Sequence, residues 1–175
     1  MTRLFFATLF AAMCAAIPSP AANPACQAIR DAAQRTYDTP THIYMSETSA
    51  FTGGKPRNTE MIYINNMSYI LVGGKWSGSP VTAQYRQEMR EVKEVDPSFT
   101  CRQARDESVN GEPATLFIMH YHSEDATTDQ QVWISKARGL PLKQDIDIGA
   151  DGAPGKNHRS MRYEYTNVRA PAGVH

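Results

Sequence analysis

The sequence predicts an α+β protein in which two α-helices pack on one antiparallel β-sheet. Three observations support this class. A segment with helical spacing follows an N-terminal leader, a second amphipathic segment lies near the middle, and most of the rest alternates apolar and polar residues between turn signals. Strands joined by short turns, with only two helical segments, indicate a meandering antiparallel sheet rather than βαβ repeats.

The composition is that of a globular chain. Of its 175 residues, 41% are hydrophobic and 21% are charged, which fits neither a disordered tail nor a membrane bundle. Eighteen Lys and Arg balance eighteen Asp and Glu, so the net charge gives no support for a nucleic-acid-binding surface. We expect a single domain over residues 22–175 and no nucleic-acid partner.

Residues 1–21 have the pattern of a signal peptide. Arg3 gives a cationic start, the uncharged run from Leu4 to Ile17 has fourteen residues, and Ser19-Pro20-Ala21 offers small residues for cleavage. An uncleaved anchor is the alternative, but the run is shorter than the ~20 residues of a membrane-spanning helix. No second apolar run follows, so we expect a soluble mature chain without a transmembrane segment.

The cysteines agree with export. Removing the leader discards Cys14 and leaves one pair, Cys26 and Cys101, which an oxidising compartment would join. Lipidation of a cysteine at the mature N-terminus, as in bacterial lipoproteins, is the alternative. Met13 stands before Cys14 where a small residue is required, and the residues before Cys26 lack the usual apolar one. We therefore expect a disulfide and a periplasmic location, with secretion as the alternative.

The first third of the mature chain predicts a helix and then strands. Asn23-Pro24 is typical of a helix start, and the helix should stop before Pro40. Residues 42–51 are rich in strand formers, and residues 60–65 and 68–72 predict a hairpin about Asn65-Asn66. Because apolar side chains occupy successive positions in both hairpin strands, both faces there are expected to be covered.

The second helix is predicted from Ser79-Pro80 to Asp96-Pro97. Val81, Tyr85, Met89 and Val92 form one apolar stripe, and charges of both signs surround it. This pattern is that of an amphipathic helix lying on the sheet, not of a membrane-surface helix.

Four or five antiparallel strands are predicted from Phe99 onward. Turn signals at 110–113, 124–129, 137–139 and 149–156 separate them. Residues 140–148 and 161–166 alternate apolar and polar side chains, so one face of these strands looks toward a core or a cavity and the other toward water.

Several short stretches resemble one known family. In the first half, Tyr69 is followed by Gly73-Gly74-Lys75-Trp76. Those of the second half are Cys101-Arg102 through Val109-Asn110-Gly111-Glu112-Pro113-Ala114, Val132-Trp133-Ile134-Ser135, Gly139-Leu140-Pro141-Leu142-Lys143, and Tyr163-Glu164-Tyr165-Thr166-Asn167-Val168. The chain thereby resembles the periplasmic lipoprotein-carrier superfamily of LolA-like and LppX-like proteins, as a short and divergent member.

This resemblance implies a strongly curved, unclosed, half-barrel-like sheet with both helices on its concave face. It further implies a non-catalytic protein that binds or carries a lipid or another lipophilic ligand between the helices and the sheet. A structural or protein-interaction module of the cell envelope, with a filled core and no ligand, is the alternative. A small enzyme or metal-binding protein is a third hypothesis.

Two strands carry the candidate lining of an apolar cleft. Alternating aromatic and methionine side chains fall on one face of each strand, where they could line a cleft or pack the core. These candidate ligand-binding residues are Phe117, Met119, Tyr121, Met161, Tyr163 and Tyr165.

The candidate chemistry is sparse. His120 and His122 are two apart on one predicted strand, so their imidazoles share a face and could chelate a metal, but no third ligand is evident. The nucleophile motif G-x-S-x-G and the C-x-x-C motif are both absent. We expect no catalytic residues, no cofactor and no physiological metal.

Overall fold

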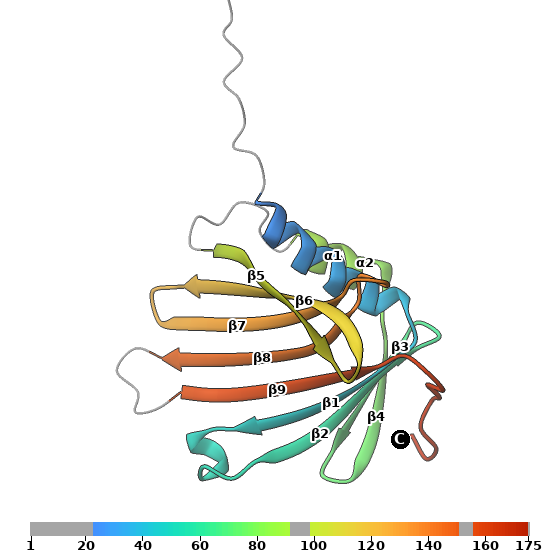
Figure 1. Ribbon diagram of the computed structural model, residues 1–175. Coiled ribbons are helices and arrows are strands. Elements are labelled where there is room, and N and C mark those ends of the chain that lie inside the picture. Colours follow the sequence, from blue (N-terminus) through green and yellow to red (C-terminus); the bar gives the residue numbers. More distant parts are fainter. Residues whose placement is uncertain (1–22, 92–98, 151–155, 175) are drawn as a thin grey trace, which may run out of the picture.

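The computed structural model describes residues 23–91, 99–150 and 156–174, and Figure 1 shows their arrangement. The predicted leader, residues 1–21, lies outside the described residues. Within them the chain forms two α-helices, one short 3-10 turn and nine strands. The elements are α1 (Pro24–Asp38), β1 (Thr41–Thr48), η1 (Ala50–Thr52), β2 (Arg57–Ile64), β3 (Met67–Val72), β4 (Lys75–Pro80), α2 (Ala83–Glu91), β5 (Phe99–Val109), β6 (Glu112–His122), β7 (Ala126–Ser135), β8 (Pro141–Ala150) and β9 (Lys156–Glu164).

All nine strands belong to one antiparallel sheet with the order β4-β3-β2-β1-β9-β8-β7-β6-β5. The first strand pairs with the last, so β1 and β9 lie in the middle of the sheet. Strands β4 and β5 are its two edges, and the sheet curves without closing while both helices lie on one side of it (Figure 1). The predicted α+β half-barrel is confirmed.

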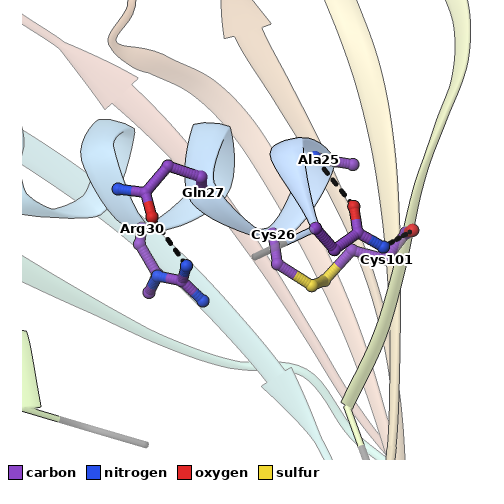
Figure 2. The surroundings of a disulfide bond; sticks show 6 residues. Ala25, Cys26, Gln27, Arg30 and Cys101 are labelled. Carbon is purple, nitrogen blue, oxygen red and sulfur yellow. Dashed lines mark hydrogen bonds between the residues drawn. A yellow bond between two sulfur atoms is a disulfide. The ribbon is translucent and has the colours of Figure 1, made fainter. Parts of the chain in front are cut away.

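Helix α1 begins and ends as the sequence predicts. The Asn23 side chain caps it by accepting a hydrogen bond from the Ala25 backbone N–H at 2.9 Å. The chain becomes extended at Thr39, directly before Pro40. In the first turn the predicted disulfide joins Cys26 to Cys101 of β5, with the two Cα atoms 5.2 Å apart (Figure 2). The helix is thereby fastened to one edge of the sheet.

The predicted hairpin is confirmed as β2 and β3. Asn65 and Asn66 connect the strands with φ values of 53° and 59°, the left-handed conformation that a tight two-residue hairpin turn requires. Ile62 is buried and its neighbours in β2 are partly buried, so both faces of β2 are covered as expected. At the end of β3, however, Val72 is 49% exposed.

The predicted start of the second helix is wrong. Ser79 and Pro80 end β4, where they pair with Ser68 and Met67 of β3. Proline lacks a backbone donor, which an edge strand such as β4 tolerates. Helix α2 begins three residues later, and Thr82 caps it by accepting a hydrogen bond from the Tyr85 backbone N–H at 3.0 Å. The predicted end at Asp96-Pro97 lies outside the described residues.

Five strands, β5 to β9, follow as predicted, but the turn before β7 is shorter. Residues 126–129 belong to β7 and not to a turn. The backbone N–H of Ser123 donates to the Ala126 carbonyl at 2.8 Å and closes the connection within four residues. Residues 127–129, all of them polar, therefore lengthen the pairing of β6 with β7.

The core has two clusters on opposite faces of the sheet. One lies beneath α1 and contains Ala25, Ile29, Ala32, Phe117, Val132 and Ile134. The other contains Ala114, Leu116, Trp133 and Leu142, with Tyr165 packed against it. Because neighbouring residues of a strand point to opposite faces, Leu116 and Phe117 of β6 enter different clusters.

Candidate functional site

An apolar cavity of about 210 Å³ lies between α1 and the middle of the sheet. Helix α1 forms one wall, and side chains of β1, β2, β7, β8 and β9 form the other. The lining residues are Ile29, Ala32, Ala33, Thr36, Tyr37, Ile43, Met45, Met61, Tyr63, Gln130, Val132, Pro141, Gln144, Met161 and Tyr163.

Strand register builds the methionine-rich floor of this cavity. Met45 of β1 is the direct partner of Met161 of β9, and Met61 of β2 is the partner of Ile43. Alternate residues of an extended strand share a face, so these side chains all point toward α1. Methionine is flexible and polarisable, which lets such a floor adapt to apolar ligands of different shapes.

The cavity also contains a polar pair. The Tyr163 hydroxyl donates a hydrogen bond to Oε1 of Gln144 at 2.6 Å. Burial raises the pKa of Tyr163 above the ordinary value for tyrosine. The phenol therefore stays neutral at physiological pH, and no charged side chain lines this cavity among the described residues.

The structure divides the six candidate lining residues. Met161 and Tyr163 line the cavity. Phe117 instead belongs to the core cluster beneath α1, and the partly buried Met119 packs against that cluster. Tyr121 stacks on Phe99 of the edge strand β5, with ring centroids 4.3 Å apart.

The sixth candidate, Tyr165, follows the end of β9 and leaves the cavity. Its ring packs against the second core cluster, and its hydroxyl donates to the Pro141 carbonyl. The guanidinium of Arg138 lies 4.9 Å from the centre of the ring. Tyr165 thus contacts the β7–β8 turn region.

Sequence reasoning missed most of the cavity wall. Ile43, Met45, Met61 and Tyr63 come from β1 and β2, whereas the candidates were chosen from β6 and β9. The alternation of Ile43 and Met45 within residues 42–51 was the available signal. It became informative only with the pairing of β1 to β9, which the sequence pattern does not specify.

A second cavity, of about 280 Å³, adjoins the first at the C-terminal end of α1. It lies between that helix end, the β2–β3 hairpin and α2. Its lining residues are Tyr37, Asp38, Thr39, Pro40, Tyr63, Ile64, Asn65, Asn66, Met67, Val81 and Arg86. Tyr37 and Tyr63 therefore line both cavities.

These two tyrosines form the boundary between the cavities. Their rings meet edge to face, with centroids 5.2 Å apart and an angle of 79°, and Tyr85 of α2 meets Tyr37 in the same way at 5.9 Å. Burial raises the pKa of Tyr63 to about 12 and also raises that of Tyr37. The boundary is thus aromatic and uncharged.

The two candidate metal-ligating histidines have local partners on the exposed face of β6 and β7. His120 Nδ1 lies 2.8 Å from Oδ1 of Asp129, and His122 Nδ1 lies 3.0 Å from the hydroxyl of Thr127. Among the described residues, no group of three or more His, Cys, Asp or Glu side chains could hold a metal ion.

In the part of the chain that the structure describes, neither α1 nor α2 is long and apolar enough to cross a bilayer.

Comparison with known proteins identifies the fold. No protein-family model matches the chain, and no curated protein matches it. MucB, solved in complex with MucA(peri), superposes with a TM-score of 0.51 at 12% identity over 85% of this chain and 60% of that chain. LppX from Mycobacterium tuberculosis superposes with a TM-score of 0.49 at 9% identity over 85% of this chain and 98% of that chain.

A LolA superfamily protein from Nitrosomonas europaea also matches, with a TM-score of 0.30 at 10% identity over 79% of this chain and 90% of that chain. Proteins of the LppX and LolA type are thus among the solved structures that the chain resembles, and the superposition on MucB shows that the chain shares the fold of that protein. At these identities the likeness concerns the fold alone.

Proposed function

We propose that this protein is a non-catalytic periplasmic protein that binds or carries a lipid or another lipophilic ligand. The observation that carries the proposal is the cavity between α1 and the sheet, with its methionine and aromatic lining and no charged side chain among the described residues. Apolar pockets with a few placed polar groups are the usual form of a ligand site. Here the polar groups include Tyr163, Gln144 and Gln130.

Two features support the periplasmic location. Residues 1–21 have the charge and length pattern of a signal peptide. The bond between Cys26 and Cys101 is of a kind that forms and persists in oxidising compartments. Secretion beyond the periplasm is the alternative.

A protein-interaction role is the second candidate function. MucB, which shares the fold, was solved in complex with MucA(peri). A protein of this fold can therefore present a surface to a protein partner of the cell envelope. In that case the cavity under α1 would hold no ligand in the purified protein.

Native mass spectrometry separates the two candidates. The protein is purified from the periplasm without detergent, weighed intact, and then extracted with organic solvent. A stoichiometric lipophilic compound in the extract supports the carrier function. A mass equal to that of the disulfide-bonded chain alone contradicts it and favours the interaction module.

A cavity-filling variant locates the ligand. Ala33 lines the cavity but is exposed, so Ala33→Phe fills its opening without displacing the core. Asp31→Phe, on the solvent side of the same helix, is the matched control. We expect Ala33→Phe to weaken binding of the uncharged fluorescent probe N-phenyl-1-naphthylamine at least tenfold, and Asp31→Phe to leave it unchanged. Equal binding by both variants would place the probe elsewhere.

A further inference from the structure

The two adjoining cavities differ in chemistry but share a wall. The cavity under α1 is lined mainly by apolar side chains and, among the described residues, by no charged one, whereas the lining of the one beside α2 also includes Asp38, Asn65, Asn66 and Arg86. Their volumes are about 210 Å³ and 280 Å³. Each is smaller than the roughly 300–1,000 Å³ of typical ligand pockets, while the two together fall within that range. A ligand that spans both would have one apolar and one polar end.

Arg86 brings an unused donor to the polar cavity. Its Nη2 donates to Oδ1 of Asn66 at 2.6 Å, and its Nη1 lies 3.6 Å from Oδ1 of Asp38. Its Nε is buried and has no hydrogen-bond partner among the described residues. Because this atom has almost no accessible surface, a ligand reaches it only when the guanidinium turns toward the cavity. A buried donor without an acceptor is costly, so a ligand oxyanion that supplies the acceptor would favour that turn.

The two charged side chains of this cavity differ in exposure. Asp38 and Arg86 are the charged side chains among its lining residues. The Asp38 side chain is 53% exposed and that of Arg86 only 22%, so water weakens their attraction across 3.6 Å. The neighbouring hydroxyls of Tyr37 and Tyr63 stay protonated and add no negative charge. The guanidinium is therefore the more buried of the two charged groups.

We propose that the ligand is a single-chain amphiphile with an oxyanion headgroup. The apolar chain lies under α1, passes the Tyr37–Tyr63 boundary, and places a carboxylate or phosphate against Arg86. A guanidinium binds either group through parallel N–H donors, and charge assistance makes such bonds about twice as strong as neutral ones. This inference rests on the proposed function, since it presumes a lipophilic ligand in the first cavity.

Competition binding tests the headgroup. N-phenyl-1-naphthylamine reports occupancy of the apolar cavity, and three competitors of equal chain length displace it: tetradecan-1-ol, tetradecanoate and tetradecyl phosphate, at about pH 8, where both anionic headgroups are ionised. We expect at least one anionic competitor to bind about 10- to 100-fold more tightly than the alcohol, as one charge-assisted hydrogen bond predicts. Whichever of the two binds more tightly identifies the headgroup.

Three variants assign that preference to the polar cavity. Arg86→Gln should abolish the advantage of the anions and leave the affinity for tetradecan-1-ol unchanged. Asp38→Asn should increase the advantage several-fold, because it removes a competing carboxylate. Arg30→Gln, on α1 outside both cavities, is the control and should behave as wild type. Far-UV circular dichroism checks that each variant is folded.

The failures are distinguishable. The headgroup inference is wrong if the alcohol and the anions compete equally in the wild-type protein. It is also wrong if Asp38→Asn and a folded Arg86→Gln both leave the preference for anions unchanged. In either case the carrier function stands. If neither the probe nor any competitor binds, the carrier function itself is wrong. An advantage of the anions that disappears in Arg86→Gln and grows in Asp38→Asn supports the inference.

Discussion

Cys26 and Cys101 lie 75 residues apart in the sequence, yet their disulfide joins the first turn of α1 to strand β5. A hydrogen bond from Asn23 Nδ2 to the Cys101 carbonyl, at 2.9 Å, supports the same junction. The other end of the helix carries Tyr37 and lies beside both cavities. The bond therefore fixes one end of the wall that covers the candidate site, while the far end depends on noncovalent contacts.

Removing the disulfide should destabilise the fold. A bridge that closes a loop of this length contributes roughly 4 kcal/mol in the chain-entropy model. We expect the double variant Cys26→Ser/Cys101→Ser to lose about 2–4 kcal/mol of unfolding free energy, measured by urea denaturation. The wild-type protein under reducing conditions is the control and should match the variant. A loss below about 1 kcal/mol would mean that noncovalent packing alone holds α1 on the sheet.

Leu116 should be the most sensitive position of the second core cluster. It is 1% exposed and packs with Ala114, Trp133 and Leu142. Leu116→Ala leaves a cavity and should cost about 2–5 kcal/mol. Val72→Ala, at a position that is 49% exposed, is the matched control and should cost less than about 0.5 kcal/mol. Thermal or urea unfolding measures both, and equal losses would contradict the core assignment.

The β2–β3 turn should prefer residues that tolerate positive φ. Asn65 has φ 53°, so Asn65→Ala should cost about 1–2 kcal/mol, whereas Asn65→Gly should be neutral or slightly stabilising. The shift of the thermal unfolding midpoint measures the difference. A glycine variant that is less stable than the alanine variant would show that the left-handed backbone conformation of residue 65 does not limit stability.

Local patterns predicted most of the fold. The capping residue Asn23, the Asn65-Asn66 turn and the alternation of Met161 and Tyr163 in β9 each depend on neighbours in the sequence, and the structure follows them. The start of α2 was placed wrongly because Ser79-Pro80 fits a helix start and an edge strand equally well. Only the pairing of β4 with β3 decides between them.

The candidate site was less predictable because it depends on which strands are neighbours. Met161 and Tyr163 were identified from their alternation, but Met45 and Met61 join them only through the pairing of β9 with β1 and of β1 with β2. In the sequence, Arg86 is one of the charged residues around the apolar stripe of the second helix. Its contact with Asn66 depends on the approach of α2 to the β2–β3 hairpin, which no local pattern encodes.

The two histidines of β6 should be dispensable. His120 pairs with Asp129 on the exposed face, and exposed pairs contribute about 0–1 kcal/mol. We expect His120→Ala/His122→Ala to change the unfolding free energy by less than about 1 kcal/mol and to leave probe binding unchanged. Elemental analysis of the wild-type protein should find no stoichiometric zinc or copper. Loss of a bound metal in the double variant would revive the metal-binding hypothesis.

Alkaline pH should destabilise the protein through its buried tyrosines. Burial, followed by the influence of Tyr85, raises the pKa of Tyr63 to about 12, whereas a tyrosine of the unfolded chain titrates near 10. Below about pH 10 both states keep this proton, and the unfolding free energy is unaffected. Between about pH 10 and 12 the unfolded state binds fewer protons than the folded state, so the unfolding free energy falls.

Urea denaturation at a series of pH values from 8 to 11.5, together with phenolate absorbance of the folded protein, measures this effect. In the folded wild-type protein, part of the phenolate signal of the eight tyrosines should appear only above about pH 11. Tyr63→Phe removes one of the buried phenols, so the unfolding free energy of this variant should fall less steeply above pH 10 than that of the wild-type protein. The contributions of lysine and arginine are common to both proteins. Parallel curves for the two proteins, or a single titration of all the tyrosines near pH 10, would show that the Tyr63 hydroxyl is hydrated and that the boundary between the two cavities is open to water.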